Sequence, residues 1–169
     1  LLSTASEAAP HPDVTARRVL DLAGSRSPTL GTGRLVCVDG PAGSGKTTLA
    51  AALQDLSPGS AVVHLDELLD GWGGLVGVDQ RLDPLLLPLA RGAPGRFERY
   101  DWVSGRFAEW VPIPPTPLLV LEGVGSGSLR HAPLCTVLVW VEVDDDLRLR
   151  RGLERDGEEM RPHWDRWMR

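Results

Sequence analysis

The stretch from Gly40 to Thr47 constrains the fold of this chain more than any other part of it. It reads Gly-Pro-Ala-Gly-Ser-Gly-Lys-Thr and matches G-x-x-x-x-G-K-[ST], the pattern of a phosphate-binding loop, or P-loop. The apolar residues 35–38 before it predict a buried strand, and residues 48–53 after it predict a helix. A match by chance is disfavoured because motif and context agree, so the sequence predicts an α/β unit that binds phosphate.

The residues of this loop suit a nucleotide together with Mg²⁺. Its glycines allow consecutive backbone N–H groups to point at phosphate oxygens, and the helix that follows offers its N-terminal N–H groups and dipole to the same anion. Lys46 is expected to reach the β- and γ-phosphates, and the Thr47 hydroxyl is expected to bind Mg²⁺. The expected nucleotide-binding residues are Gly40, Ala42, Gly43, Ser44, Gly45, Lys46, Thr47 and Thr48.

Lys46 is the only lysine in the chain, since the other seventeen of its 18 basic residues are arginine. Arginine is a planar fork, whereas lysine is a compact charge on a flexible stem, which is what this loop requires. A lysine kept only at this position indicates function rather than composition.

Length and composition indicate one soluble domain of ordinary size. The chain has 169 residues, 42% of them hydrophobic and 24% charged, and a net charge of −5 that disfavours a general nucleic-acid binder. No apolar stretch is long enough to span a bilayer, and the first residues lack the features of a signal peptide, so a cytoplasmic protein without a membrane partner is expected. Cys37 and Cys135 lie in apolar runs and are expected to be buried, reduced thiols.

The pattern along the chain divides it into an N-terminal segment and a P-loop domain. Residues 1–33 are expected to hold a poorly ordered tail, 1–12, and a short helix, 14–23, capped by Asp13. Strands are expected at 35–39, 61–65, 118–121 and 136–141, and further helices up to residue 56 and at 145–154.

Apolar strands that alternate with helices predict a parallel sheet covered on both faces. The expected fold class is therefore α/β, a P-loop NTPase with a three-layer αβα sandwich. Ligands of such folds bind beyond the carboxyl ends of the strands. Asp66, Glu122 and the P-loop each follow a predicted strand, so they should converge.

The two carboxylates have distinct expected roles. Asp66 could orient or deprotonate an acceptor hydroxyl beside the γ-phosphate, with Glu67 as the second candidate, or it could cap a helix. Glu122 ends the run Leu-Val-Leu-Glu-Gly and could hold Mg²⁺, or it could be a loop carboxylate. His64 is expected to be a packed or hydrogen-bonded strand residue rather than a ligand.

Residues 67–117 form a long insertion with no clear strand, and such insertions are usually functional. An aromatic residue beside a carboxylate suits a flat or hydroxyl-rich substrate. The residues expected to contact the substrate are Asp66, Trp72, Tyr100, Asp101 and Arg106. The tryptophans at 72, 102 and 110 fit a small apolar core equally well.

Arg148, Arg151 and Arg155 share one face of the helix predicted at 145–154. One interpretation is a solvated surface helix. The other is a lid, about 148–161, whose arginines neutralise the transferring phosphoryl group and point into solvent before ligands bind. The P-loop in the same chain favours the lid, and the expected catalytic residues are Lys46, Asp66, Arg151 and Arg155.

The order of these motifs resembles the uridine kinase-like branch of the P-loop nucleoside and nucleotide kinases over most of residues 34–157. The motifs are the P-loop, Asp66 after the second strand, Tyr-Asp in the insertion, Glu-Gly after the third strand and Arg-x-x-Arg-x-x-x-Arg-Asp. The resemblance implies a kinase domain at 34–169 that uses ATP and Mg²⁺. It further implies Asp66 as base, Tyr100 and Asp101 near the acceptor, and Arg151 and Arg155 in the lid.

The expected function is ATP-dependent transfer of the γ-phosphoryl group to a small, nucleoside-like acceptor. An acceptor other than uridine is indicated, because no histidine stands between Tyr100 and Arg106. One alternative is a kinase for a non-nucleoside metabolite or an antibiotic. The other is a nucleotide-binding switch or accessory ATPase.

Overall fold

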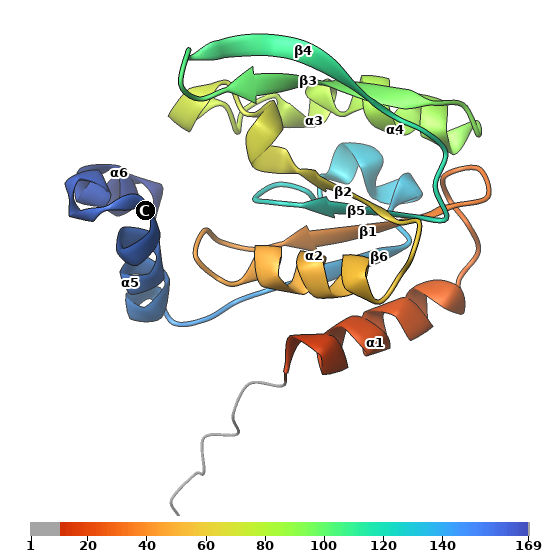
Figure 1. The fold of residues 1–169 in the computed structure, drawn as a ribbon, viewed down its shortest axis with the longest axis horizontal. Coiled ribbons are helices and arrows are strands. Elements are labelled where there is room, and N and C mark those ends of the chain that lie inside the picture. Colours follow the sequence, from red (N-terminus) through yellow and green to blue (C-terminus); the bar gives the residue numbers. More distant parts are fainter. Residues whose placement is uncertain (1–10, 169) are drawn as a thin grey trace, which may run out of the picture.

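A four-stranded parallel sheet forms the centre of the protein, whose structure, a computed structural model, describes residues 11–168. The strands are β1 (Arg34–Asp39), β2 (Ala61–His64), β5 (Leu118–Glu122) and β6 (Val137–Trp140). They lie in the order β2-β5-β1-β6, and each neighbouring pair is parallel (Figure 1). The predicted α/β fold with a central parallel sheet is confirmed.

Two helices, α1 (Pro12–Gly24) and α2 (Lys46–Asp55), cover one face of this sheet (Figure 1). Apolar residues of both helices pack in one core with the buried Val36 and Val38 of β1 and Val120 of β5. Helix α1 differs from its prediction at its start, where His11 and not Asp13 is the N-cap. Pro12 explains the shift, because proline suits the first helical position. The expectation of a poorly ordered tail lies, for residues 1–10, outside the described residues.

The other face is covered by α3 (Val78–Arg81) and α4 (Asp83–Ala90), both within the insertion. Leu85, Leu86 and Leu89 of α4, together with Leu82 before it, are buried in the core that includes β1, β2 and β5, whereas Leu87 of the same helix is exposed. Pro84 and Pro88 were expected to break this leucine-rich stretch. Pro84 instead occupies the first turn, where it loses no hydrogen bond, and Pro88 lies inside the same short helix.

A β-hairpin corrects the expectation of no clear strand in residues 67–117. Strands β3 (Gly95–Asp101) and β4 (Arg106–Ile113) pair antiparallel, and Figure 1 shows the hairpin lying over α3 and α4. Phe97 and Tyr100 are the buried side chains of β3, and a bulge between Glu98 and Tyr100 separates them by three positions. This bulge breaks the alternation of period two by which strands are identified in sequences.

The described chain ends in an arm that lies beyond the P-loop end of the sheet (Figure 1). The arm consists of α5 (Asp145–Asp156), η4 (Glu158–Met160) and α6 (Arg161–Trp167). The remaining short helices of the described chain are η1 (Leu65–Leu68), η2 (Gly71–Gly73) and η3 (Leu129–Leu134). Within residues 11–168 no helix has the length and apolar character needed to cross a bilayer.

Helix α5 of the arm is attached directly to the P-loop. Arg148 is buried, and its Nε donates to the carbonyl oxygen of Ala42 at 2.9 Å while its Nη1 lies 2.6 Å from Asp145 Oδ1. A Cβ at Gly43 would lie only 2.6 Å from the Arg148 carbonyl oxygen, so the two backbones touch. Farther along the arm, Trp164 packs over Gly152, where a Cβ would lie 2.2 Å from its ring.

The carboxylate of Asp39 joins the P-loop to the loop that follows β5. Its Oδ1 accepts from the backbone N–H groups of Gly40 at 2.7 Å and Gly125 at 2.9 Å, and its Oδ2 accepts from Gly127 at 2.8 Å. Asp39 is buried at the end of β1. The cysteines are free thiols as predicted, although Cys135, just before β6, is only half-buried.

We predict that Asp39→Asn lowers the free energy of unfolding by about 1–3 kcal/mol. The asparagine amide would present N–H donors to backbone N–H donors, which leaves buried groups unpaired. Urea denaturation measures the change, with Asp21→Asn on the exposed side of α1 as the control. An unchanged unfolding midpoint in Asp39→Asn would contradict this role.

Candidate functional site

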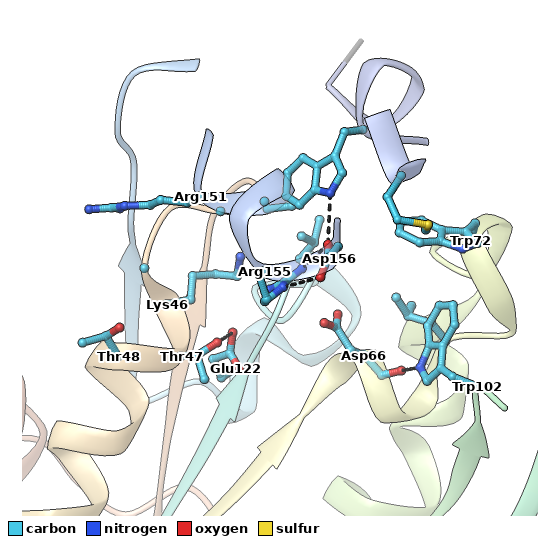
Figure 2. A pocket seen from close by; sticks show the side chains of 18 of the residues that line it. Lys46, Thr47, Thr48, Asp66, Trp72, Trp102, Glu122, Arg151, Arg155 and Asp156 are labelled. Carbon is cyan, nitrogen blue, oxygen red and sulfur yellow. Dashed lines mark hydrogen bonds and ion pairs between the residues drawn. The ribbon is translucent and has the colours of Figure 1, made fainter. Parts of the chain in front are cut away.

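A cavity of about 540 Å³ opens at the carboxyl end of the sheet, between the P-loop, the ends of β2 and β5, and the arm (Figure 2). The lining residues that the sequence had singled out for the site are Ala42, Gly43, Gly45, Lys46, Thr47, Thr48, Asp66, Trp72, Glu122, Arg151 and Arg155. The other lining residues are Leu69, Gly71, Trp102, Val124, Gly152, Asp156, Met160 and Trp164. Residues more than 100 positions apart in the sequence thus share one cavity.

The P-loop has the backbone geometry of an anion cradle. Gly43 and Gly45 have φ angles of +76° and +104°, values that residues with a side chain rarely adopt. Gly45 is also the N-cap of α2. Within the described chain, the buried Ser44 hydroxyl has no hydrogen-bond partner. An unpaired donor beside a helix N-terminus fits an anionic ligand such as a nucleotide phosphate.

Lys46 lies at the mouth of this cradle. Its Nζ donates to the Pro41 carbonyl oxygen across the loop at 2.9 Å, which holds the side chain beside the loop. Burial lowers the pKa of Lys46, although the carboxylates of Glu122 and Asp66 oppose this shift. The ammonium group is therefore poorly hydrated, and an anionic phosphate would stabilise it.

Gly40 belongs to the turn into the P-loop and does not line the cavity. Its φ is +134°, and a Cβ there would lie 2.1 Å from the carbonyl oxygen of Val141. Gly40 therefore has a structural reason to be glycine that is separate from contact with a ligand.

Glu122 faces both the P-loop and β2 from the end of β5. Its Oε1 accepts from the Thr47 hydroxyl at 3.3 Å, and its Oε2 lies 2.7 Å from His64 Nδ1. This contact raises the pKa of His64, which is hydrogen-bonded as predicted. Thr47 and Glu122 bring two oxygens close together, an arrangement that fits Mg²⁺ completed by phosphate and water. Among residues 11–168 no three His, Cys, Asp or Glu side chains gather as a metal site.

Asp66 lies in the first turn of η1, immediately after β2, and its carboxylate points into the cavity (Figure 2). Partial desolvation by the surrounding chain raises the pKa of this carboxyl, although the residue keeps contact with solvent, and the charge of Glu122 raises the pKa further, while Lys46 and Arg155 oppose the shift. His64 and not Asp66 is the N-cap of η1, so the capping alternative does not apply. A carboxylate with a raised pKa beside a phosphate site is suited to accept a proton.

The residues expected to contact a substrate occupy different environments. Trp72 lines the cavity, whereas Tyr100 is buried and packs with T-shaped geometry on Trp102. Asp101 accepts from Val103 N at 2.9 Å and Ser104 Oγ at 2.7 Å, so it closes the turn of the hairpin. Tyr100, Asp101 and the exposed Arg106 are not among the residues that line the cavity.

The three arginines that were predicted to share one face of α5 have different surroundings. Arg151 and Arg155 line the cavity, whereas Arg148 is held by the P-loop and does not point into solvent as expected. Arg155 donates twice to Asp156, at 2.6 and 2.9 Å, and Asp156 also accepts from Trp164 Nε1 at 3.0 Å (Figure 2). The hydrogen bond from Arg155 lowers the pKa of Asp156. These contacts fix the direction of Arg155.

Apart from Trp72, sequence reasoning did not identify the apolar and aromatic part of the lining, and it also missed Asp156. One usable signal was Gly152, a glycine inside a helix, which is unfavourable unless another group approaches closely. Trp164 is that group. Leu69 and Val124 carried no signal, because apolar residues beside strand ends are typical of any core.

Comparison with known proteins supports this fold. No protein-family profile matches the chain. An alignment 139 residues long, which covers 74% of this chain, shows 31% identity to the inorganic pyrophosphatase TTM1 of Arabidopsis thaliana and spans only 22% of that protein.

Two solved structures resemble nearly the whole chain. One is described as a candidate fructose transport system kinase from Silicibacter sp. TM1040, with a TM-score of 0.64, 18% identity and coverage of 93% of this chain and 89% of the other. The second is described as a possible uridine kinase from Bacillus stearothermophilus, with a TM-score of 0.58, 16% identity and coverage of 93% and 91%. At these identities the likeness concerns the fold, and it confirms at that level the resemblance to uridine kinase-like P-loop kinases.

We predict that Asp66→Asn slightly raises the thermal stability at pH 7, by up to about 2 °C. The folded state raises the pKa of Asp66, so the charged form costs stability above the folded pKa. This cost disappears below the ordinary aspartate pKa of about 3.9, and the advantage of the variant should shrink as the pH falls from 7 towards 4. Melting curves measure it, with the exposed Asp55→Asn as the control. A less stable Asp66→Asn protein at pH 7 would disprove the argument from desolvation.

Proposed function

We propose that this chain is a kinase that transfers the γ-phosphoryl group of ATP to a hydroxyl of a small, nucleoside-like acceptor. One observation carries the proposal: a single cavity is lined by the P-loop with Lys46, by the carboxylate of Asp66 and by Arg155 of the arm. Phosphoryl transfer needs little more than positioning and charge neutralisation, and these residue types supply both. The fold shared with two proteins described as kinases supports the same reading.

The nucleotide end of the cavity is formed by the P-loop and the end of β5. The backbone N–H groups of the loop and the ammonium of Lys46 would bind the phosphates. The side chain of Ser44 is buried, and Ser44 is not among the residues that line the cavity. Thr47 and Glu122 would hold Mg²⁺, and His64 orients Glu122 through the contact at Oε2. Bound Mg²⁺ would neutralise charge on the phosphate oxygens.

The acceptor end favours a hydroxyl over a phosphate. Its lining residues are Asp66, Leu69, Gly71, Trp72 and Trp102. None of the arginines of the insertion lines the cavity, and three of them are engaged elsewhere. Arg81 lies over the Phe107 ring, Arg96 lies over the Trp110 ring, and Arg99 is paired with Glu109. The lining cations belong to the P-loop and the arm, so an acceptor phosphate would meet a carboxylate and apolar rings.

The transfer step follows from this arrangement. Asp66 would take the proton of the acceptor hydroxyl while the acceptor oxygen bonds to the γ-phosphorus, and the bond from that phosphorus to the bridging oxygen breaks to release ADP. Arg151 and Arg155 would neutralise the equatorial oxygens. The insertion, 67–117, supplies the acceptor end, and the segment 148–161 acts as a lid that excludes water.

Hydrolysis of a phosphoanhydride is the second candidate function, because the curated relative is named an inorganic pyrophosphatase. In that case water would replace the organic acceptor. The apolar rings of Trp72 and Trp102 at the acceptor end favour an organic molecule over water.

The test measures ADP formation from ATP and Mg²⁺ with nucleosides, their monophosphates, sugars, antibiotics with hydroxyl groups, or no acceptor. We expect turnover that depends on an unphosphorylated hydroxyl compound. Lys46→Ala and Lys46→Arg should each lower it by about 10²–10³-fold or more, because charge and shape are both needed. Exposed Arg150→Ala is the control. Phosphate release from ATP or pyrophosphate without any acceptor would favour hydrolysis, and full activity in Lys46→Arg would refute the role of the loop.

We also predict that Glu122→Gln raises the Mg²⁺ concentration needed for half-maximal turnover by about tenfold, with a smaller effect on the maximal rate. The amide keeps the shape of the carboxylate and removes the charge that favours a cation. A Mg²⁺ titration measures the midpoint, with Glu67→Gln as the control, since Glu67 does not line the cavity. The same midpoint in Glu122→Gln and wild type would exclude Glu122 from the metal site.

A further inference from the structure

Trp102 connects the tip of the β3–β4 hairpin to the end of β2. It lies in the turn between the two strands, yet its indole Nε1 donates to the carbonyl oxygen of Asp66 at 3.0 Å (Figure 2). The same indole lines the cavity. A side chain from the insertion therefore reaches both the backbone of the proposed base and the space for the acceptor.

We infer that Trp102 positions Asp66 and also forms the face on which a ring of the acceptor rests. This inference rests on the proposed kinase function. It narrows the acceptor to an unphosphorylated alcohol that carries a flat or apolar ring close to its reacting hydroxyl. Because one indole makes both contacts, it sets the distance between that ring and the carboxylate of Asp66.

The hairpin turn holds Trp102 in a defined direction. Asp101 accepts hydrogen bonds from Val103 N and Ser104 Oγ, and its carbonyl oxygen accepts from Gly105 N at 2.8 Å. Buried Tyr100 packs against the Trp102 ring with centroids 5.3 Å apart and planes at 82°. The indole is thus oriented before any ligand binds, as a positioning residue requires.

Asp66 depends on support from outside its own element. It lies in η1, a single turn of 3₁₀ helix whose N-cap, His64, makes no side-chain capping bond. Such a short helix has few internal hydrogen bonds, and their geometry is poorer than in an α-helix. The indole N–H therefore adds a tertiary restraint to the carbonyl of the residue whose carboxylate must meet the acceptor.

The surface of Trp102 that remains open suits a ring. The side chain is 44% exposed although it lines a cavity, and Trp72 lies against it with centroids 5.8 Å apart and planes at 71°. Aromatic side chains favour edge-to-face and offset contacts with other rings. A flat acceptor would cover apolar surface that is otherwise in water.

Trp110 provides a matched control within the same hairpin. It lies on β4, it is 45% exposed, and the Arg96 guanidinium lies over its ring at 4.6 Å. It is not among the residues that line the cavity. Substitutions at Trp110 therefore measure how the loss of an exposed tryptophan affects the hairpin without a change in the cavity.

The experiment compares Trp102→Phe and Trp102→Leu with Trp110→Phe and Trp110→Leu in the full chain, using the best acceptor of the panel. Phenylalanine keeps a ring and loses the N–H donor, so we expect kcat to fall about 10–100-fold with little change in the KM for the acceptor. Leucine loses both, so the KM for the acceptor should also rise about tenfold. The KM for ATP should stay unchanged, and both Trp110 variants should behave as wild type.

Amide hydrogen exchange gives a readout that does not need turnover. Residues 65–68 should exchange faster in Trp102→Phe and not in Trp110→Phe, while melting curves check that every variant is folded. If the wild-type protein shows no acceptor-dependent turnover, the proposed function fails. If the exchange of residues 65–68 is also the same in Trp102→Phe and wild type, Trp102 does not position Asp66 either. With an active wild type, equal kinetics in the Trp102 and Trp110 variants would overturn the inference alone. An equal KM in Trp102→Phe and Trp102→Leu would refute the ring contact.

Discussion

The carboxylate of Asp39 is the contact on which the geometry of the site depends. It gathers three backbone N–H groups, from Gly40 at the start of the P-loop and from Gly125 and Gly127 after β5. The P-loop follows β1, and Glu122 ends β5, so this clamp ties the phosphate cradle to the strand that carries the proposed metal ligand. Hydrogen bonds from N–H groups to a charged carboxylate are among the stronger hydrogen bonds in proteins. Here the carboxylate lies where the P-loop meets the loop after β5.

The sequence was sufficient to predict the parts of the site that follow from local pattern and sheet topology. A parallel sheet brings the carboxyl ends of its strands to one edge, so Asp66, Glu122 and the P-loop had to meet once the strands were identified. The cavity confirms that they line one space. The roles assigned to them as base, metal ligand and phosphate cradle stay predictions.

The parts that could not be predicted depend on contacts between distant segments. The bulge in β3 interrupts the strand pattern, so the hairpin was not predicted. The geometry of the hairpin brings Trp102 to the cavity and leaves Tyr100 and Asp101 outside its lining. Arg148 has the same helical spacing as Arg151 and Arg155, but the carbonyl of Ala42 holds it in the P-loop. The spacing of residues in a sequence shows which of them share a helix face. It does not show which other part of the chain will bury each of them.

The solitary lysine of the chain has a chemical consequence. Lys46 carries the only side-chain amine in this sequence, and it is buried beside the P-loop. Because burial lowers its pKa, a larger share of this amine is neutral and nucleophilic than in an exposed lysine. Any acylating reagent that reaches it would remove the positive charge that the cradle offers to phosphate. A reagent specific for side-chain amines would therefore modify this sequence at Lys46 Nζ alone, and a bound nucleotide would protect that atom.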